Sequence, residues 1–380
     1  MSFSNATKVF IASVLAVPLT YVYNMVMLLI QWDTTSPVAW LIGALFILTV
    51  LSVSVVRSSG SHGYGVKKQD NYQFYVFAVS SVSGVVALII ALELDGIISG
   101  FMGVFLKVVE PNLRSAHGTM MCYWHGTGMY AMNLLIVTAI SWNNAFIEVG
   151  LFWCGSIANS MVVLLLAALS GKHGLTWGTL LYISFALISA PEFLKIWQQK
   201  EIPKTGLPPL PVRKRSLDCL CMLFLTFASF MAVFRGLAVL GADSQTIQDY
   251  VTYIEPYLAL QDPAPFPKIQ MLVYLFYFLP LYIVTAYGLV YEGCYWVPDI
   301  TVIHAGAAVQ AQIIHIGASL HPRTPYVQRV PPNGVSLFLF WGINLLLLVG
   351  PIFMAWNFWN NFHFASREVI TRRDSTQKKE

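Results

Sequence analysis

Residues 335–358 read VSLFLFWGINLLLLVGPIFMAWNF, and no charged residue occurs among them. As a helix with a rise of 1.5 Å per residue, this stretch is about 36 Å long and crosses a hydrocarbon core of about 30 Å. Apolar residues cover it on all sides, whereas a surface helix of a soluble protein keeps a polar face. The stretch therefore predicts a transmembrane helix.

Similar apolar stretches recur along the whole chain. The composition agrees, since 57% of the 380 residues are hydrophobic and 11% are charged, whereas about a quarter of a soluble domain is charged. We predict an all-α, polytopic membrane protein with about ten transmembrane helices. They cover 9–30, 39–56, 72–94, 117–140, 147–169, 175–198, 216–240, 268–291, 298–320 and 335–358.

The basic residues orient these ten helices, because cytosolic loops of membrane proteins are enriched in lysine and arginine. With a cytosolic N-terminus, fifteen basic residues fall on the cytosolic side and six on the opposite side, and Arg235 falls inside a helix. The asymmetry predicts that both termini face the cytosol.

Signatures of cofactor, metal and nucleic-acid sites are missing from the sequence. There is no P-loop and no dinucleotide-binding fingerprint, and no basic stripe interleaves with aromatic residues. The five cysteines form no C-x-x-C pair and fall in or beside apolar stretches, which is typical of small buried side chains. They are Cys122, Cys154, Cys219, Cys221 and Cys294. We predict no cofactor, no metal and no nucleic-acid partner.

Two stretches of the sequence echo each other. Val109–Leu113 (VEPNL) precedes the fourth predicted helix and Ile254–Leu258 (IEPYL) precedes the eighth. Gly155–Ser160 in the fifth helix likewise corresponds to Gly306–Ala311 in the ninth. This pattern indicates two copies of a four-helix unit with the same orientation in the membrane, as in parallel transporter repeats.

The repeat sets the predicted domain organisation. The units are an N-terminal helix pair (1–60), a first four-helix domain (61–200), a basic and proline-rich cytosolic linker (201–215), a second four-helix domain (216–358) and a basic cytosolic tail (359–380).

Polar side chains within the predicted helices are candidates for a ligand site, because such groups are costly in hydrocarbon. A set of this kind can line a pocket that holds a mostly apolar ligand by one polar end. The candidates are Tyr123, Trp124, His125, Asn159, Arg235, Gln312, His315 and Asn344. The alternative is that each bonds a neighbouring helix, as asparagine and glutamine do routinely. We expect that alternative for His304 and Glu192, and for Arg235 we expect a partner acid or carbonyl in the bundle.

Several motifs resemble those of the transmembrane 6 superfamily, and the similarity extends from the N-terminus to about residue 356. The motifs in the first half are Asp95–Ile98 and Cys122–Trp124. Those in the second half are Phe234–Leu237, Pro267–Leu272, Trp296–Asp299, His315–His321, Arg323–Pro325 and Arg329–Pro331. Within the family, the Ile303–Gly306 run is more similar to the first member than to the second.

This resemblance implies two EXPERA domains, the four-helix unit shared with the emopamil-binding sterol isomerase and the sigma-2 receptor. Sterol isomerisation needs an acid, a base and an aromatic wall. His125 stands where the family usually has aspartate, and Ala87 stands where relatives often have aspartate or asparagine. Arg235 has no carboxylate at the matching depth of the eighth helix, whereas Asn344 resembles an asparagine of the isomerase. The resemblance therefore implies a retained pocket with an incomplete acid pair.

We thus expect a membrane protein of lipid homeostasis that binds a sterol or another membrane lipid. One alternative is a sterol isomerase, with His125 as the proton shuttle and Glu93 as its catalytic partner. Another is a lipid transporter or scramblase, which midplane polar residues between parallel repeats would also suit. The resemblance implies the endoplasmic reticulum, its intermediate compartment with the Golgi, or the lysosomal membrane. It does not identify membrane-protein partners.

Overall fold

The computed structural model describes residues 4–29, 70–182, 204–205, 212–291, 294–360 and 366–367. The predicted helix 39–56 and most of 175–198 lie outside these residues, although 177–182 are helical. The elements of the first half are α1 (Asn5–Val14), α2 (Ala16–Leu29), α4 (Asp70–Leu94), α5 (Gly103–Val108), η1 (Pro111–Arg114), α6 (Ala116–Trp124), η2 (His125–Met129), α7 (Tyr130–Ser141) and α8 (Ile147–Ser170).

The second half also consists of long helices joined by short ones. Its elements are η3 (Val212–Lys214), α10 (Ser216–Leu240), α11 (Gln245–Tyr253), η4 (Pro256–Ala259), α12 (Phe266–Val273), η5 (Tyr274–Phe278), α13 (Leu279–Val290), α14 (Val297–Leu320), η6 (Tyr326–Gln328) and α15 (Gly334–Trp359). Two short strands, β1 (Lys204–Thr205) and β2 (Ser366–Arg367), pair in parallel.

Seven helices in the described part of the chain are long and apolar enough to cross a membrane. They are Asn5–Val26, Tyr72–Leu94, Ile147–Ser170, Ser216–Leu240, Phe266–Val290, Val297–Leu320 and Gly334–Trp359. Each coincides with a helix predicted from the sequence, and the chain is a polytopic, helical membrane protein. The predicted helix 117–140 is also present, formed by α6, η2 and α7 in succession.

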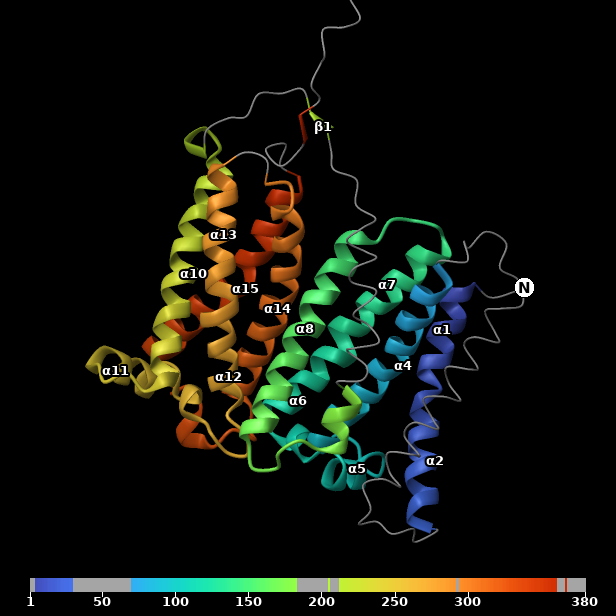
Figure 1. Ribbon diagram of the computed structural model, residues 1–380. Coiled ribbons are helices and arrows are strands. Elements are labelled where there is room, and N and C mark those ends of the chain that lie inside the picture. The colour runs from blue at the N-terminus through green and yellow to red at the C-terminus, as the bar shows by residue number, and fades with distance from the viewer. Residues whose placement is uncertain are drawn as a thin grey trace, which may run out of the picture.

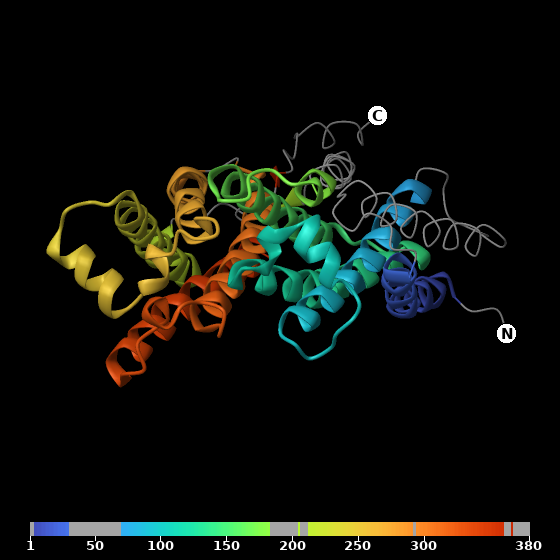
Figure 2. The same ribbon diagram turned by 90° about the horizontal axis from the view of Figure 1, so that it is seen from below.

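The two halves lie side by side and meet along α8 and α14 (Figure 1). Helices α4 to α8 form the first group, α10 to α15 form the second, and α1 packs against the outer side of α4 and α7. Seen from below, α11 projects at the far end of the second group (Figure 2). The hydrophobic core of the first half extends into α12 and α14, so the halves share a packed interface.

A glycine from each half permits the close crossing of α8 and α14. A side chain on Gly155 would overlap the backbone carbonyl of Ile303, and a side chain on Gly306 would overlap that of Phe152. Small residues let helices approach in this way inside membranes, where packing contributes much of the association energy. The crossing therefore fixes how the two halves sit together.

In each half, the middle of one transmembrane helix widens into a π-turn. His125–Met129 joins α6 to α7, and Tyr274–Phe278 joins α12 to α13. Such bulges disturb the regular hydrogen-bond ladder and occur frequently at functional sites.

The segments before α6 and α12 are folded at the same end of the bundle. Each contains a short 3₁₀ helix that begins at a proline, Pro111 or Pro256, directly after a glutamate. Both glutamates, Glu110 and Glu255, are fully buried. We call this end of the molecule the Glu-Pro end.

Candidate functional site

A buried ion pair between Arg235 and Glu255 is the centre of a polar cluster in the second half. The Arg235 guanidinium donates to a carboxylate oxygen of Glu255, to the Tyr250 hydroxyl at 3.1 Å and to the Asn344 amide oxygen at 2.9 Å. The Asn344 amide nitrogen in turn donates to Glu255 at 2.7 Å. The prediction that Arg235 has a partner acid or carbonyl within the bundle is therefore confirmed.

His315 joins this cluster from α14. Its Nε2 lies 3.6 Å from the second carboxylate oxygen of Glu255, and its ring packs edge-on against Tyr257 with centroids 5.6 Å apart. Tyr274 of η5 lies near enough to Arg235 and Glu255 to interact with both charges. Burial alone would raise the pKa of Glu255, but the Arg235 charge together with the contacts of His315 and Asn344 outweighs it and holds this pKa well below its usual range. The carboxylate is therefore ionised.

Around the ion pair, several buried polar atoms have no hydrogen-bond partner within the described residues. They are Arg235 Nη1, Glu255 Oε2, the hydroxyls of Tyr257 and Tyr274, both amide atoms of Gln312 and both ring nitrogens of His315. Some of these atoms lie near one another at more than hydrogen-bond distance, such as His315 Nε2 and Glu255 Oε2 at 3.6 Å, and Gln312 interacts with Tyr274. Buried polar groups nearly always find a partner, because leaving one unpaired costs about 1–3 kcal/mol. The set offers donors and acceptors to a polar group from outside the chain, and its central ion pair carries no net charge.

The corresponding glutamate of the first half has different surroundings. Glu110 accepts hydrogen bonds from the hydroxyls of Thr176 and Thr179, at 2.5 and 2.7 Å, and from the backbone N–H of Asn112 at 3.3 Å. Its described contacts are with neutral donors, whereas Glu255 has a guanidinium. The two halves therefore differ in chemistry at the same kind of position.

His125 and Trp124 lie in the core of the first half. The His125 ring is 3.2 Å from the Ser160 hydroxyl, and the Trp124 indole N–H donates to Ser156 at 2.7 Å. His125 also lines a cavity of about 20 Å³ with Ser80, Asn133 and other residues. That volume holds about one water molecule, so this pocket is too small for a lipid.

Glu93 and Tyr123 form hydrogen bonds at the Glu-Pro end of the molecule. Glu93 accepts hydrogen bonds from the backbone N–H groups of Phe101 and Met102, at 3.0 and 2.5 Å. Tyr123 donates to Asp95 at 2.7 Å, and the same carboxylate lies 3.1 Å from His321. These contacts connect the end of α4 with the segment before α5, with α6 and with the end of α14, which indicates a structural role for both residues.

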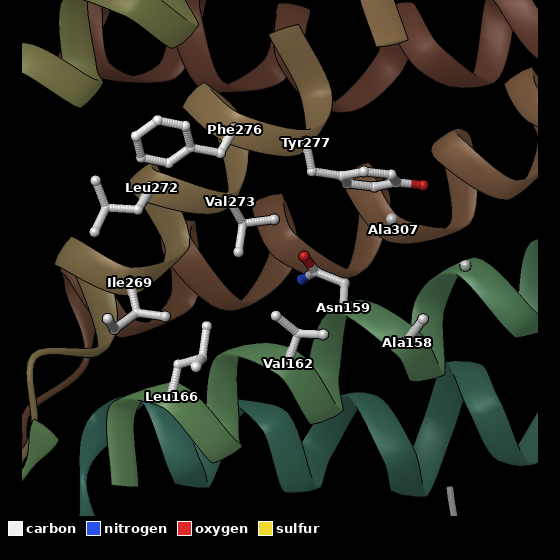
Figure 3. A pocket seen from close by; sticks show the side chains of 11 residues that line it. Ala158, Asn159, Val162, Leu166, Ile269, Leu272, Val273, Phe276, Tyr277 and Ala307 are labelled. Carbon is white, nitrogen blue, oxygen red and sulfur yellow. The ribbon is translucent and has the colours of Figure 1, made fainter. Parts of the chain in front are cut away.

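Asn159 lies at the interface of the two halves. Its amide nitrogen donates to Gln310 of α14 and to Gln270 of α12, the latter at 3.1 Å. Beside this amide cluster, α8 and the α12–η5 segment enclose a groove of about 610 Å³ (Figure 3). The residues that line it are Gly155, Ala158, Asn159, Val162, Leu166, Ile269, Leu272, Val273, Phe276, Tyr277 and Ala307.

The site residues predicted from the sequence therefore do not form one site, because the structure places them in different parts of the molecule. Arg235, His315 and Asn344 come together around Glu255, and Gln312 lies one turn from His315 on α14. Glu255 itself was missed, because it lies outside the apolar stretches that define the helices. The repeated Glu-Pro motif was the available signal, since it marked the same position in both halves.

Comparisons with known proteins agree with this architecture. The family described as Transmembrane 6 superfamily member 2-like, transmembrane domain, matches residues 15–206, and the EXPERA family matches residues 244–358. The mouse protein Transmembrane 6 superfamily member 2 is 35% identical over 96% of each chain. The human protein of that name is 35% identical over 92% of each chain. No solved structure matches. At this identity over nearly the whole length, the chain belongs to the transmembrane 6 superfamily.

Proposed function

We propose that the protein binds a sterol or another neutral lipid inside its second half, with the polar end of the ligand at the Arg235–Glu255 cluster. The observation that carries this proposal is the group of buried, unpartnered donors and acceptors around the ion pair. A hydroxyl or ester could satisfy several of them at once. A charged headgroup would instead be unbalanced there, because the ion pair is already neutral as a whole.

Binding without catalysis suits this cluster better than isomerisation. An isomerase must hold one group protonated and another free to accept a proton at the same pH. Glu255 is ionised by its contact with Arg235 and is a poor proton donor. Glu93 is bonded to two backbone N–H groups. We therefore expect no double-bond isomerisation of a Δ8-sterol by the purified protein, and turnover abolished by His125→Ala would contradict this.

Gln312→Leu should weaken binding of a sterol photoprobe by about 1–3 kcal/mol, or roughly five- to 150-fold. Within the described residues the Gln312 side chain interacts with the neighbouring Tyr274 hydroxyl, so its loss disturbs one contact inside the cluster and none with the Arg235–Glu255 ion pair. The measurement is the probe concentration for half-maximal labelling in nanodiscs. Gln73→Leu is the matched control, because Gln73 is also buried with an unpartnered amide nitrogen but lies in the first half.

The same titration distinguishes the two halves. Weaker labelling in His125→Ala, together with unchanged labelling in Gln312→Leu, would place the ligand in the first half and contradict the proposal. Unchanged labelling in both variants would contradict intramembrane binding at either cluster.

We propose that both termini face the cytosol, because the basic residues of the loops and tails are concentrated on the side of the termini. Tags at either end should be accessible to antibody after the plasma membrane alone is permeabilised. A tag inserted beside Gln248, in the exposed part of α11 at the Glu-Pro end, should stay protected until all membranes are opened. Protection of either terminal tag would refute this topology.

We also propose that the halves are copies of one four-helix unit. Corresponding residues meet across the interface: Asn159 bonds Gln310, 151 positions later, and the His117 ring stacks on that of Phe266 with centroids 4.4 Å apart. The Gly155–Gly306 crossing has the same 151-residue spacing. Contacts between equivalent positions are expected where two copies are related by a two-fold axis.

A further inference from the structure

The groove between α8 and the α12–η5 segment runs along the interface of the two halves, outside the polar cluster around Glu255. Its α8 wall extends from Gly155 to Leu166, which is about 16 Å along a helix axis. One leaflet of a bilayer has a hydrocarbon thickness of about 15 Å. The groove therefore spans about one leaflet, from the middle of α8 towards the Glu-Pro end.

The wall of this groove is apolar and open to the surrounding membrane. Val162 and Leu166 on one side and Phe276 on the other are exposed, with 71% of Phe276 accessible. Figure 3 shows Val162 and Leu166 pointing from α8 towards the α12–η5 segment, which carries Phe276 on its far side. The Asn159 amide is already bonded to Gln270 and Gln310, so the groove does not require a polar group in the middle of its occupant.

On the opposite flank of the interface, between α6 and α14, side chains of the described residues pack closely, and we call it the filled flank. Trp124 occupies the position equivalent to Val273, and its ring covers Gly128 and reaches Ser156. Met120 occupies the position equivalent to Ile269 and packs on Gly317, which is equivalent to Leu166. One difference between the two flanks is therefore that Val273 lines the groove where the other flank has the larger ring of Trp124.

Two lysines lie close in the chain to the residues that line the Glu-Pro end of the groove, Leu166 and Ile269. We call this region the mouth of the groove. Lys172 follows the end of α8, Lys268 lies in the first turn of α12, and the Lys172 N–H donates to the Pro263 carbonyl at 2.7 Å. With the nearby Asp262, this mouth carries a net positive charge of one. A lysine ammonium attracts the phosphate that every glycerophospholipid headgroup carries.

We propose that this groove binds one acyl chain of a glycerophospholipid from the leaflet at the Glu-Pro end, with its phosphate near Lys172 and Lys268. The groove supplies the length and apolar wall that an acyl chain needs, and the lysines supply the charge that a phosphate needs. This site is separate from the neutral-lipid cluster around Glu255 and holds a different class of lipid.

The test uses the full-length protein in nanodiscs that contain phosphatidylglycerol with a diazirine in one acyl chain. Crosslinks should map to α8 and to the α12–η5 segment. Val162→Trp should reduce the labelling about tenfold by filling the groove. Ile313→Trp is the matched control, because Ile313 is the equivalent position on the filled flank, and it should leave the labelling unchanged. Monodisperse gel-filtration profiles should confirm that both variants are folded.

A second arm tests the headgroup. The double variant Lys172→Gln and Lys268→Gln should reduce the labelling, and its remaining labelling should no longer fall with added salt. Equal labelling in Val162→Trp and Ile313→Trp would overturn the groove as the site. Stronger labelling of the groove by a sterol probe than by the phospholipid would overturn the assigned lipid class. Gln312→Leu should leave phospholipid labelling unchanged, which separates this result from the test of the Glu255 cluster.

Discussion

Arg235→Leu should destabilise the folded protein by about 3–5 kcal/mol, because it leaves Glu255 as an unpaired carboxylate in a fully buried site. Arg235→Lys should cost less, since a lysine keeps the positive charge although it loses the branched donor geometry. The measurement is folded yield from gel filtration in detergent, with the midpoint of thermal unfolding. Arg114→Leu is a suitable control, because Arg114 is exposed at the same end of the molecule.

A double variant separates the ion pair from the rest of the cluster. Glu255→Leu alone should also be severely destabilising, since it leaves the guanidinium unpaired. Arg235→Leu with Glu255→Leu together should recover much of the lost stability, because replacing a whole buried pair with apolar residues is often nearly neutral. Equal yields for Arg235→Leu and Arg235→Lys would indicate that the charge of Arg235 is unimportant.

The pH dependence of this ion pair has a defined sign. The pKa of Glu255 is lowered in the folded protein to about 2, against burial, by Arg235 and by further contacts with His315 and Asn344. Its contribution to stability is therefore fully present above the pKa of an unfolded glutamate, which is about 4.3. It is lost only as the pH falls from there towards 2. The pair should stay intact in a mildly acidic compartment.

Hydropathy was enough to locate the seven described helices that are long and apolar enough to span a membrane, because each one must carry about twenty apolar residues whatever it packs against. The same reasoning could not find the structure of 241–265. There α11 and η4 fold back and bury Glu255 and Tyr257, yet the stretch is polar enough to resemble an exposed loop. The total of ten transmembrane helices stays a prediction, since 39–56 and most of 175–198 lie outside the described residues.

The sequence likewise predicted only part of the candidate site. The sequence predicted Arg235, His315 and Asn344 as candidates for a ligand site, and these three meet around one carboxylate. It could not show that Asn159 belongs to the interface or that Tyr123 bonds Asp95, because these contacts depend on the rotation of each helix. Hydropathy also gives no signal for the groove, since its wall is as apolar as any lipid-facing surface.

Gly155→Ala and Gly306→Ala should each prevent the two halves from packing in their present arrangement. In both cases the added methyl group would overlap a backbone carbonyl, that of Ile303 or of Phe152. A backbone in a helix cannot move aside as a flexible side chain can, so α8 and α14 must separate. We expect a loss of about 3 kcal/mol or more, at the upper end of what overpacking costs.

The same substitution elsewhere provides the control. Gly342→Ala adds a methyl group to α15 where no atom lies within 4 Å, and it should be neutral or slightly stabilising, because alanine favours helix more than glycine does. Thermal unfolding and gel filtration of the three variants compare these expectations. Because separation of α8 from α14 would also break the Asn159–Gln310 bond and widen the groove, phospholipid labelling should fall in the Gly155 and Gly306 variants alone. Equal stability of all three variants would mean that the helices do not cross at these glycines.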